Sequence, residues 1–236
     1  EPYDTQATAA ADIQTAIDFS DNGDEIVILP GVYSNSSPVT VNKDLTVRGA
    51  TGNPEDVVIH QTAAERCLII RAPKEAIVHS LVLEDGYLYK AEGFEEDAET
   101  VLENGNKNEK DCQGAGALIA SDDVGVNPAC GTLSNVVVRN CFVTYQLARC
   151  PGVAAIGPKA FVTHSVISNC NSFSGFQNQG RLCALALYLK DGSRAENCLI
   201  ARNYTKADVT YQIPYDADIW NWEKGKIGYA YQGLYH

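Results

Sequence analysis

Short apolar stretches recur along the chain, and each one ends in the same pattern of polar and apolar positions. Four of these endings align without gaps on their apolar pairs, Val82-Leu83, Val137-Val138, Val166-Ile167 and Leu199-Ile200. The polar positions before the pairs hold Ser80, Asn135, His164 and Asn197, and those after them hold Asp85, Asn140, Asn169 and Arg202. An internal repeat of this kind predicts a stack of similar structural units.

Each repeat is too short and too apolar to fold alone, so neighbouring copies must pair their backbones around a shared interior. Asn and Gly at the bends suit a backbone with positive φ. A parallel β-helix meets these requirements, because each coil returns to its start roughly 4.8 Å, one strand spacing, further along the stack. We therefore predict parallel strands without crossover helices.

The N-terminal part of the chain predicts a helix followed by strands. Residues 9–20 have apolar positions on one face, including Ile13 and Ile17, which predicts a short amphipathic helix that covers the open end of the stack. Alternating or continuous apolar residues predict strands at residues 25–33, 38–49 and 57–61.

The composition limits the classes of protein to which this chain can belong. The repeats favour one elongated domain over residues 1–236, and the net charge of −12 argues against a nucleic-acid partner. No apolar run approaches the ~20 residues that span a bilayer. The sequence shows no signal peptide and contains no methionine, so we expect a processed or excised segment of a longer protein.

The eight cysteines leave two interpretations open. No C-x-x-C pair occurs, which argues against a zinc site. Cys141 and Cys170 occupy one column of neighbouring coils, at a spacing that suits either a disulfide or a ladder of buried thiols. Cys112, Cys150 and Cys183 all precede or begin the first strand of a coil, so a second bridge among them is a further candidate.

An acidic insertion at residues 92–114 carries eight carboxylates. They are Glu92, Glu95, Glu96, Asp97, Glu99, Glu103, Glu109 and Asp111. Carboxylate oxygens suit calcium, but their spacing matches no calcium-binding loop. A solvated acidic loop is the favoured interpretation, so we predict no metal site and no cofactor, with calcium bound by this loop as the weaker alternative.

The run DIQTAIDFSDNGDEIVILPGVYSNSSPVTVNKDLTVRGATGNPEDVVI resembles the first coils of secreted right-handed parallel β-helix proteins of the pectin-lyase-like superfamily. The later runs NCLIARN and LSNVVVRNC resemble its coil repeats, and the similarity covers most of residues 9–204. The resemblance implies an all-β, single-stranded right-handed parallel β-helix of about six coils with a short N-terminal capping helix. It also implies a secreted or cell-surface protein.

Under this resemblance, one sheet of the stack carries the binding groove. Its expected strands are residues 26–29, 67–71, 115–120, 153–156, 183–189 and 227–231. The long turns that feed these strands, at residues 91–114, 146–151, 173–182 and 205–226, would project from one side of the stack. Long loops on one side of a rigid scaffold are a common place for binding, and in this superfamily that side is the usual carbohydrate groove.

Basic and aromatic residues near this groove are the candidate site residues. If the protein is catalytic, Arg149, Arg181 and Lys190 would act as base or charge stabiliser in the β-elimination of a uronate. The candidate substrate-binding residues, some of which would stack on sugar rings, are Tyr188, Gln177, Gln179, Trp220 and Trp222. The aromatic-rich segment at residues 205–236 has a second interpretation, as a plug for the end of the stack; alternatively, the native protein continues.

The known enzymes of the superfamily fit this sequence poorly. Gly31-Val32-Tyr33 matches a G-x-Y turn of pectin methylesterases, but the QDT and DFIFG signatures of those enzymes are missing. The W-I-D-H and R-x-P-x-x-R segments of pectate lyases are missing too. The leading interpretation is therefore polysaccharide engagement outside the cell, by binding rather than cleavage. A structural or adhesive module of a larger surface protein and a lyase of acidic polysaccharides remain the alternatives.

Overall fold

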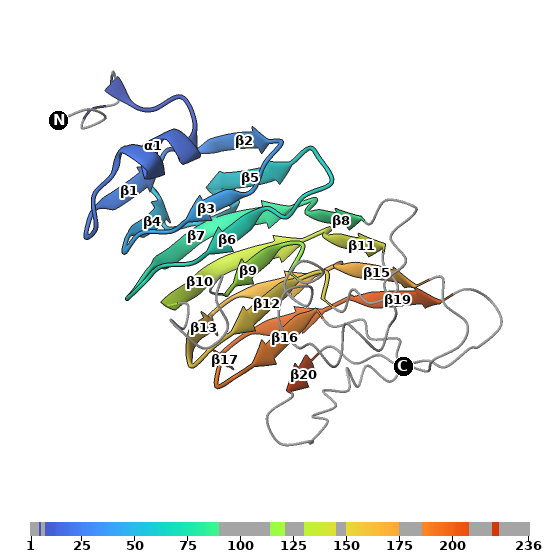
Figure 1. Cartoon of the computed structure of the whole chain (residues 1–236). Helices are drawn as coiled ribbons and strands as arrows, with labels where there is room; N and C mark the ends of the chain where they lie inside the picture. Colours follow the sequence, from blue (N-terminus) through green and yellow to red (C-terminus); the bar gives the residue numbers. More distant parts are fainter. Residues whose placement is uncertain are drawn as a thin grey trace.

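Parallel β-strands dominate the computed structural model of the chain (Figure 1). The structure describes residue 5 and residues 8–89, 114–120, 130–144, 150–174, 186–207 and 219–221. Within these ranges the strands form three sheets, and every pairing between named strands is parallel. The fold is all-β with stacked parallel sheets.

The three sheets, which we call A, B and C, each collect strands from successive repeats. Sheet A contains β1 (Glu25–Ile28), β2 (Gly31–Asn35), β4 (Thr46–Gly49), β5 (Val57–Gln61), β7 (Ile77–Glu84), β10 (Cys130–Arg139), β13 (Lys159–Thr163), β14 (Val166–Ser168), β17 (Arg194–Glu196) and β18 (Leu199–Ala201). Sheet B contains β3 (Val39–Val41), β6 (Leu68–Ile70), β9 (Ala117–Ile119), β12 (Val153–Ile156), β16 (Leu187–Lys190) and β20 (Ile219–Asn221). Sheet C contains β8 (Tyr87–Tyr89), β11 (Phe142–Thr144), β15 (Asn171–Ser174) and β19 (Tyr204–Ala207).

The path of the chain carries it through the sheets in a fixed order. From β12 in sheet B it passes through β13 and β14 in sheet A, then β15 in sheet C, and it returns to sheet B at β16. Strand β16 then pairs with β12, where the circuit began, through Val153 and Leu187. This return by one strand spacing per circuit is compatible with a β-helix.

The repeat alignment predicted from the sequence is confirmed by the strand register. Val82 pairs with Val137, Val137 with Val166, and Val166 with Leu199. The two polar columns lie at the bends, and all their members have positive φ. These residues are Ser80, Asn135, His164 and Asn197 in one column, and Asp85, Asn140, Asn169 and Arg202 in the other. A residue in this left-handed conformation bends the chain within a single position. At Ser80 and Asn135 the bend lies inside β7 and β10, whereas at His164 and Asn197 it separates two strands.

The prediction of the groove sheet is partly wrong at its beginning. Residues 26–29 were expected in the sheet of residues 67–71, but β1 pairs with β4 in sheet A, and β3 is the strand that pairs with β6. The predicted strand at residues 38–49 is divided between β3 and β4. Strands of both sheets contribute apolar residues to the same core, so the apolar pattern alone does not indicate which sheet a strand joins. Residues 227–231 lie outside the described residues.

The interior is an apolar core that runs along the stack. On sheet A one ladder of core residues comprises Ile59, Leu83, Val138 and Ile167, all at most 1% exposed. At the N-terminal end, helix α1 (Ile13–Phe19) inserts Ile13 and Ile17 into the same core. The helix lies within the predicted residues 9–20, and Figure 1 shows it at the end of the sheets.

Side-chain hydrogen bonds attach α1 to the first strand of sheet B. The Gln14 amide donates to the Thr40 carbonyl over 3.3 Å and accepts from the Thr40 backbone N–H over 2.7 Å. It thereby satisfies backbone groups at a sheet edge, which would otherwise be open to pairing with another chain. Lys43 donates to the carbonyls of Ile17, Asp18 and Ser20 at the C-terminal end of the helix.

Candidate functional site

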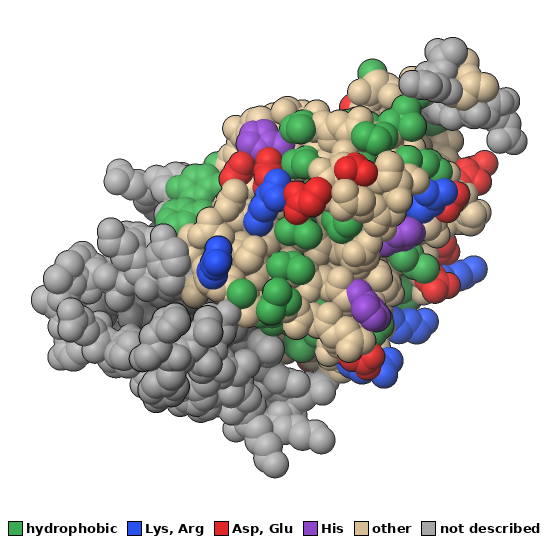
Figure 2. Space-filling model, turned by 180° about the vertical axis from the view of Figure 1, so that it is seen from behind, with side chains coloured by type: hydrophobic (Ala, Val, Ile, Leu, Met, Phe, Trp, Pro, Cys, Tyr) green, Lys and Arg blue, Asp and Glu red, His purple; other side chains and the backbone are tan. Residues whose placement is uncertain are grey.

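A charged cluster lies on the outer face of sheet A, where β5, β7 and β10 lie side by side. The register places His60 of β5 beside Glu84 of β7, and Glu84 beside Arg139 of β10. Their side chains alternate with those of the core ladder and therefore point outward. In Figure 2, acidic, basic and histidine side chains lie next to one another on one face, with apolar side chains between them.

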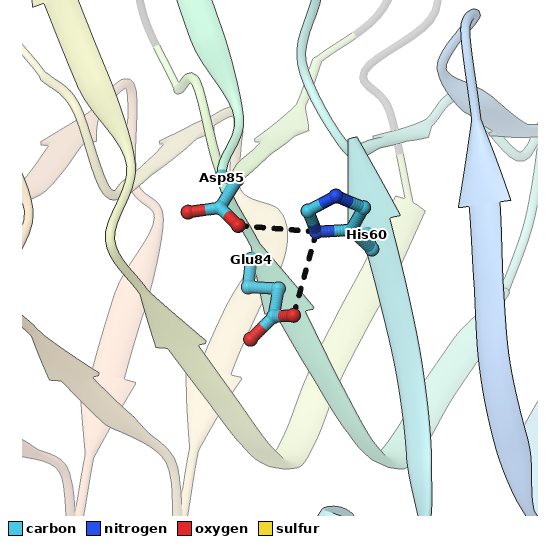
Figure 3. A group of neighbouring side chains, drawn as sticks. All are labelled: His60, Glu84 and Asp85. Carbon is cyan, nitrogen blue, oxygen red and sulfur yellow. Dashed lines mark ion pairs between the residues drawn. The ribbon is translucent and has the colours of Figure 1, made fainter. Parts of the chain in front are cut away.

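Two carboxylates approach the same imidazole nitrogen in this cluster (Figure 3). His60 Nδ1 lies 3.0 Å from Asp85 Oδ2 and 3.4 Å from Glu84 Oε1. The three ligand-type atoms lie within 4.8 Å of one another. The side chains of His60, Glu84 and Asp85 are 33%, 17% and 41% exposed, so the cluster opens to the surface.

The left-handed bend at Asp85 explains why consecutive carboxylates can act together. Successive side chains of a regular strand point to opposite faces of the sheet. Glu84 ends β7 and points outward, so a continued strand would direct the next side chain inward. The φ of 61° at Asp85 breaks this alternation, and its carboxylate reaches the same nitrogen as that of Glu84.

Arg139 fixes the orientation of the Glu84 carboxylate. Its Nε donates to Glu84 Oε2 over 2.9 Å, which leaves Oε1 directed toward His60. Its Nη1 donates to Glu55 Oε2 over 2.8 Å. Burial alone would lower the pKa of Arg139, but its hydrogen bonds to the Glu84 and Glu55 carboxylates outweigh the effect of burial and raise that pKa. The guanidinium is therefore a permanent charge that holds two acids.

A short loop crosses the outer face of the sheet and supplies Glu55. Its 3-10 helix η2 (Pro54–Asp56) packs against β7 and β10. The loop is held by a hydrogen bond of 3.0 Å from the Asn135 side chain to the Gly52 carbonyl, and by one of 2.6 Å from Thr51 to Asp56. The charged cluster thus joins three parts of the chain that are far apart in sequence, namely η2 with the following β5, the end of β7, and β10.

Sequence reasoning did not find this cluster. The repeat alignment assigns Asp85 to a column of bend residues, whereas the apolar pattern assigns His60 and Glu84 only to strands. The available signal was a histidine and a glutamate at outward positions of two adjacent strands. It could be used only with the register between β5 and β7, which the alignment of repeats did not include.

The residues predicted to bind sugar lie on or near sheet B, as far as the structure describes them. Tyr188 of β16 is the register partner of Trp220 of β20. The Tyr188 side chain is completely buried, in a small apolar cluster with Leu118, Ala120, Cys150 and Ala154 on the outer side of sheet B. Its stacking on sugar stays a prediction, and it would require this cluster to open.

Among the other candidate residues, the structure describes Lys190. Lys190 is the last residue of β16, with a half-buried side chain. Arg149, Arg181, Gln177, Gln179, Trp222 and the acidic insertion up to residue 113 lie outside the described residues. Their roles stay predictions.

Six cysteines within the described residues are free thiols, so the structure supports no disulfide there. They are Cys67, Cys130, Cys141, Cys150, Cys170 and Cys198. The Cys170 thiol contacts Cys141, and this contact together with burial raises its pKa well above the usual value. The ladder of buried thiols is the alternative that agrees with the structure.

Comparisons with known proteins identify no relative. No protein-family model, no curated protein and no solved structure matches the chain. Among the described residues, no helix has the length and apolar character needed to cross a membrane.

Proposed function

We propose that this chain is a right-handed parallel β-helix of the pectin-lyase-like kind that binds polysaccharide outside the cell, without cleaving it. The sequence resemblance supports the fold assignment and the secreted or cell-surface location. The finer features proposed with it are a single-stranded helix of about six coils and α1 as its N-terminal cap.

The observation that carries the proposal is the common anchoring of the long connections. Residues 90–116, 145–152, 175–186 and 208–218 each leave a strand of sheet C and return to a strand of sheet B. Their ends are register neighbours, as β11 is to β15 and β12 is to β16. The connections are thus anchored along one border of a rigid scaffold, an arrangement typical of binding sites.

Some of the candidate residues belong to these connections, and others lie on the strands of sheet B that the connections enter. Gln177, Gln179 and Arg181 belong to the connection between β15 and β16, and Arg149 to the one between β11 and β12. Lys190 and Trp220 lie on neighbouring strands of sheet B. Basic side chains here would complement an acidic polysaccharide, whereas the net charge of −12 makes general electrostatic attraction to such a polymer a poor explanation.

A glycan array probed with the full chain tests the proposal. The expected result is saturable binding to one class of polysaccharide that is weakened by Lys190→Ala. Arg194→Ala is the matched control, because Arg194 is an exposed cation on β17 of sheet A and should leave binding unchanged. No binding to any polysaccharide would contradict the proposal and favour a structural or adhesive module.

An ultraviolet assay on the same acidic polysaccharides separates binding from cleavage. β-Elimination creates an unsaturated product that absorbs in the ultraviolet. Because the protein is proposed to bind without cleavage, absorbance should stay constant with and without calcium. Growing absorbance would show a lyase instead, and would direct attention to Arg149, Arg181 and Lys190 as base or charge stabiliser.

A further inference from the structure

We propose that His60, Glu84 and Asp85 form a binding site for a divalent transition-metal ion, of which Zn²⁺ is the best fit. The site lies on the outer face of sheet A and is independent of the polysaccharide proposal. It also differs from the expectation of no metal site, which considered cysteine pairs and the acidic insertion but not histidine.

The first argument is the unsatisfied nitrogen at the centre of the cluster. His60 Nδ1 is buried as an atom, yet it has no hydrogen-bond partner in the part of the chain that the structure describes. Asp85 and Glu84 lie near it at 3.0 and 3.4 Å, but neither oxygen lies in the direction that a hydrogen bond requires. A buried polar atom left unsatisfied costs about 1–3 kcal/mol, and a bound ion would remove this cost.

The second argument is the separation of the ligand atoms. Two ligands that each lie about 2.1 Å from one ion are about 3.0 Å apart in octahedral and about 3.4 Å apart in tetrahedral geometry. The two nitrogen–oxygen distances in the cluster are 3.0 and 3.4 Å. The distances from His60 Nδ1 to the two carboxylate oxygens are therefore those expected when all three atoms bind one ion.

The third argument is the support behind the ligands. Metal-binding carboxylates are commonly oriented by hydrogen bonds from a second layer of residues. Arg139 supplies such a bond to Glu84 Oε2, and its own charge is balanced by Glu55. Arg139 therefore holds one oxygen of Glu84 and leaves Oε1 facing His60 (Figure 3).

The ligand set indicates the class of ion. Carboxylates alone suit calcium and magnesium, whereas an imidazole ligand suits zinc and its neighbours in the first transition row. Three protein ligands would leave a position for water on the solvent side. Because the ligands come from β5 and from β7 with its following bend, the ion would also join two consecutive coils.

Zn²⁺ titration of the chelator-treated full chain tests this site, after accessible thiols have been alkylated so that cysteines do not compete. Competition with a chromophoric chelator should show one bound Zn²⁺ per chain. Affinity should fall at least tenfold in His60→Gln and in Asp85→Asn. The second variant should fold normally, because the equivalent bends already hold Asn140 and Asn169 at positive φ.

The chain contains a matched control on the same sheet. Glu25, Arg48 and His79 also combine an acid, an arginine and a histidine, but only one carboxylate is present in this group. His79→Gln and Glu25→Gln should therefore leave Zn²⁺ affinity unchanged. Co²⁺ bound in place of Zn²⁺ should give visible bands without thiolate charge transfer.

Three results would overturn the proposal. They are the absence of saturable Zn²⁺ binding, binding that survives both His60→Gln and Asp85→Asn, and binding of Ca²⁺ as tight as that of Zn²⁺. The first would leave the cluster as an ion pair of His60 with two acids. The second would place the ion elsewhere, and the third would contradict the assignment to transition metals.

Discussion

Asn169 donates a side-chain hydrogen bond of 2.6 Å to Oδ1 of Asn140, its equivalent in the preceding repeat. Both residues have positive φ, 53° and 57° respectively. The same side chain type therefore serves two purposes, since Asn tolerates the left-handed bend and its amide links one bend to the next. Stacked bends of this kind fix the register between coils.

Substitutions at Asn169 should separate these two contributions. Asn169→Gly keeps the bend and removes the hydrogen bond, which should cost about 0.5–1.5 kcal/mol. Asn169→Ala also loses the bond but keeps a Cβ in left-handed backbone, without the polar side chain by which Asn tolerates this conformation, so it should cost more than the glycine variant. Urea unfolding followed by circular dichroism should rank the proteins as wild type, then Gly, then Ala. Equal stability of the two variants would show that the bend carries no strain.

Gly152 is expected to be intolerant of any side chain. A Cβ at this position would lie 2.1 Å from the carbonyl oxygen of Ala186, which belongs to the backbone of the next coil. Because backbone cannot turn away as a side chain can, Gly152→Ala should cost about 1–3 kcal/mol or more through displacement of the coils.

Gly31→Ala is the control for this substitution. Its added Cβ would meet only the Tyr33 ring, at an ordinary contact distance of 3.6 Å. Thermal unfolding of both variants should show a clear loss for position 152 and little change for position 31. A wild-type melting temperature for Gly152→Ala would contradict the close packing of consecutive coils at this point.

The repeats were predictable because each copy has the same local order of polar and apolar residues. Residues that tolerate positive φ, such as Asn135 and Asn140, before and after an apolar pair identify bends and strands without knowledge of their partners. The His60–Glu84–Asp85 cluster was not predictable in this way. It depends on which strand is next to which, and on the η2 loop that returns over the sheet to provide Glu55, and neither property is written in the local pattern.

The assignment of β1 to the wrong sheet has the same cause. Ile26 and Val47 occupy equivalent core positions on neighbouring strands of sheet A, but Val39 and Leu68 on sheet B look no different in sequence. Burial of alternate residues indicates that a strand has an inner face. It does not indicate which sheet the strand belongs to, because all three sheets surround the same core.

Lys43 should anchor the N-terminal helix to the stack. Its ammonium donates to the carbonyls of Ile17, Asp18 and Ser20 over 3.0, 2.8 and 2.7 Å. These groups lie at the negative end of the helix dipole, where a cation is favourable. Lys43→Met keeps the aliphatic stem and removes the charge, so it should cost about 1–2 kcal/mol.

Hydrogen exchange measured by mass spectrometry locates the effect of Lys43→Met. The peptide that covers α1 should exchange faster in the variant, whereas peptides from β10 and β13 should be unchanged. Lys74→Met is a suitable control, because it removes an exposed lysine whose side chain is not part of this cap. Faster exchange throughout the chain would instead indicate that the helix is required for the stability of the whole stack.

Buried thiols should make the protein sensitive to alkaline pH. Burial raises the pKa of the Cys150 thiol, and contact with Cys141 together with burial raises that of Cys170. A raised pKa means that the folded state favours the protonated thiol, so this stability is complete below the unfolded thiol pKa near 8.5 and is lost at higher pH. The free energy of unfolding should fall by about 1.4 kcal/mol per pH unit for each such thiol above that point.

Urea unfolding under reducing conditions between about pH 7.5 and pH 10.5 tests this dependence. Lysines and tyrosines also titrate in this range. The informative quantity is therefore the difference between wild type and Cys150→Ala in the slope of unfolding free energy against pH. Cys150→Ala removes one buried thiol and should be less stable than wild type at neutral pH, because its packing is lost. Its stability should nevertheless decline less steeply above pH 9, by about one proton's contribution. Parallel slopes would mean that the Cys150 thiol ionises as easily in the folded chain as in the unfolded one, which its complete burial does not allow.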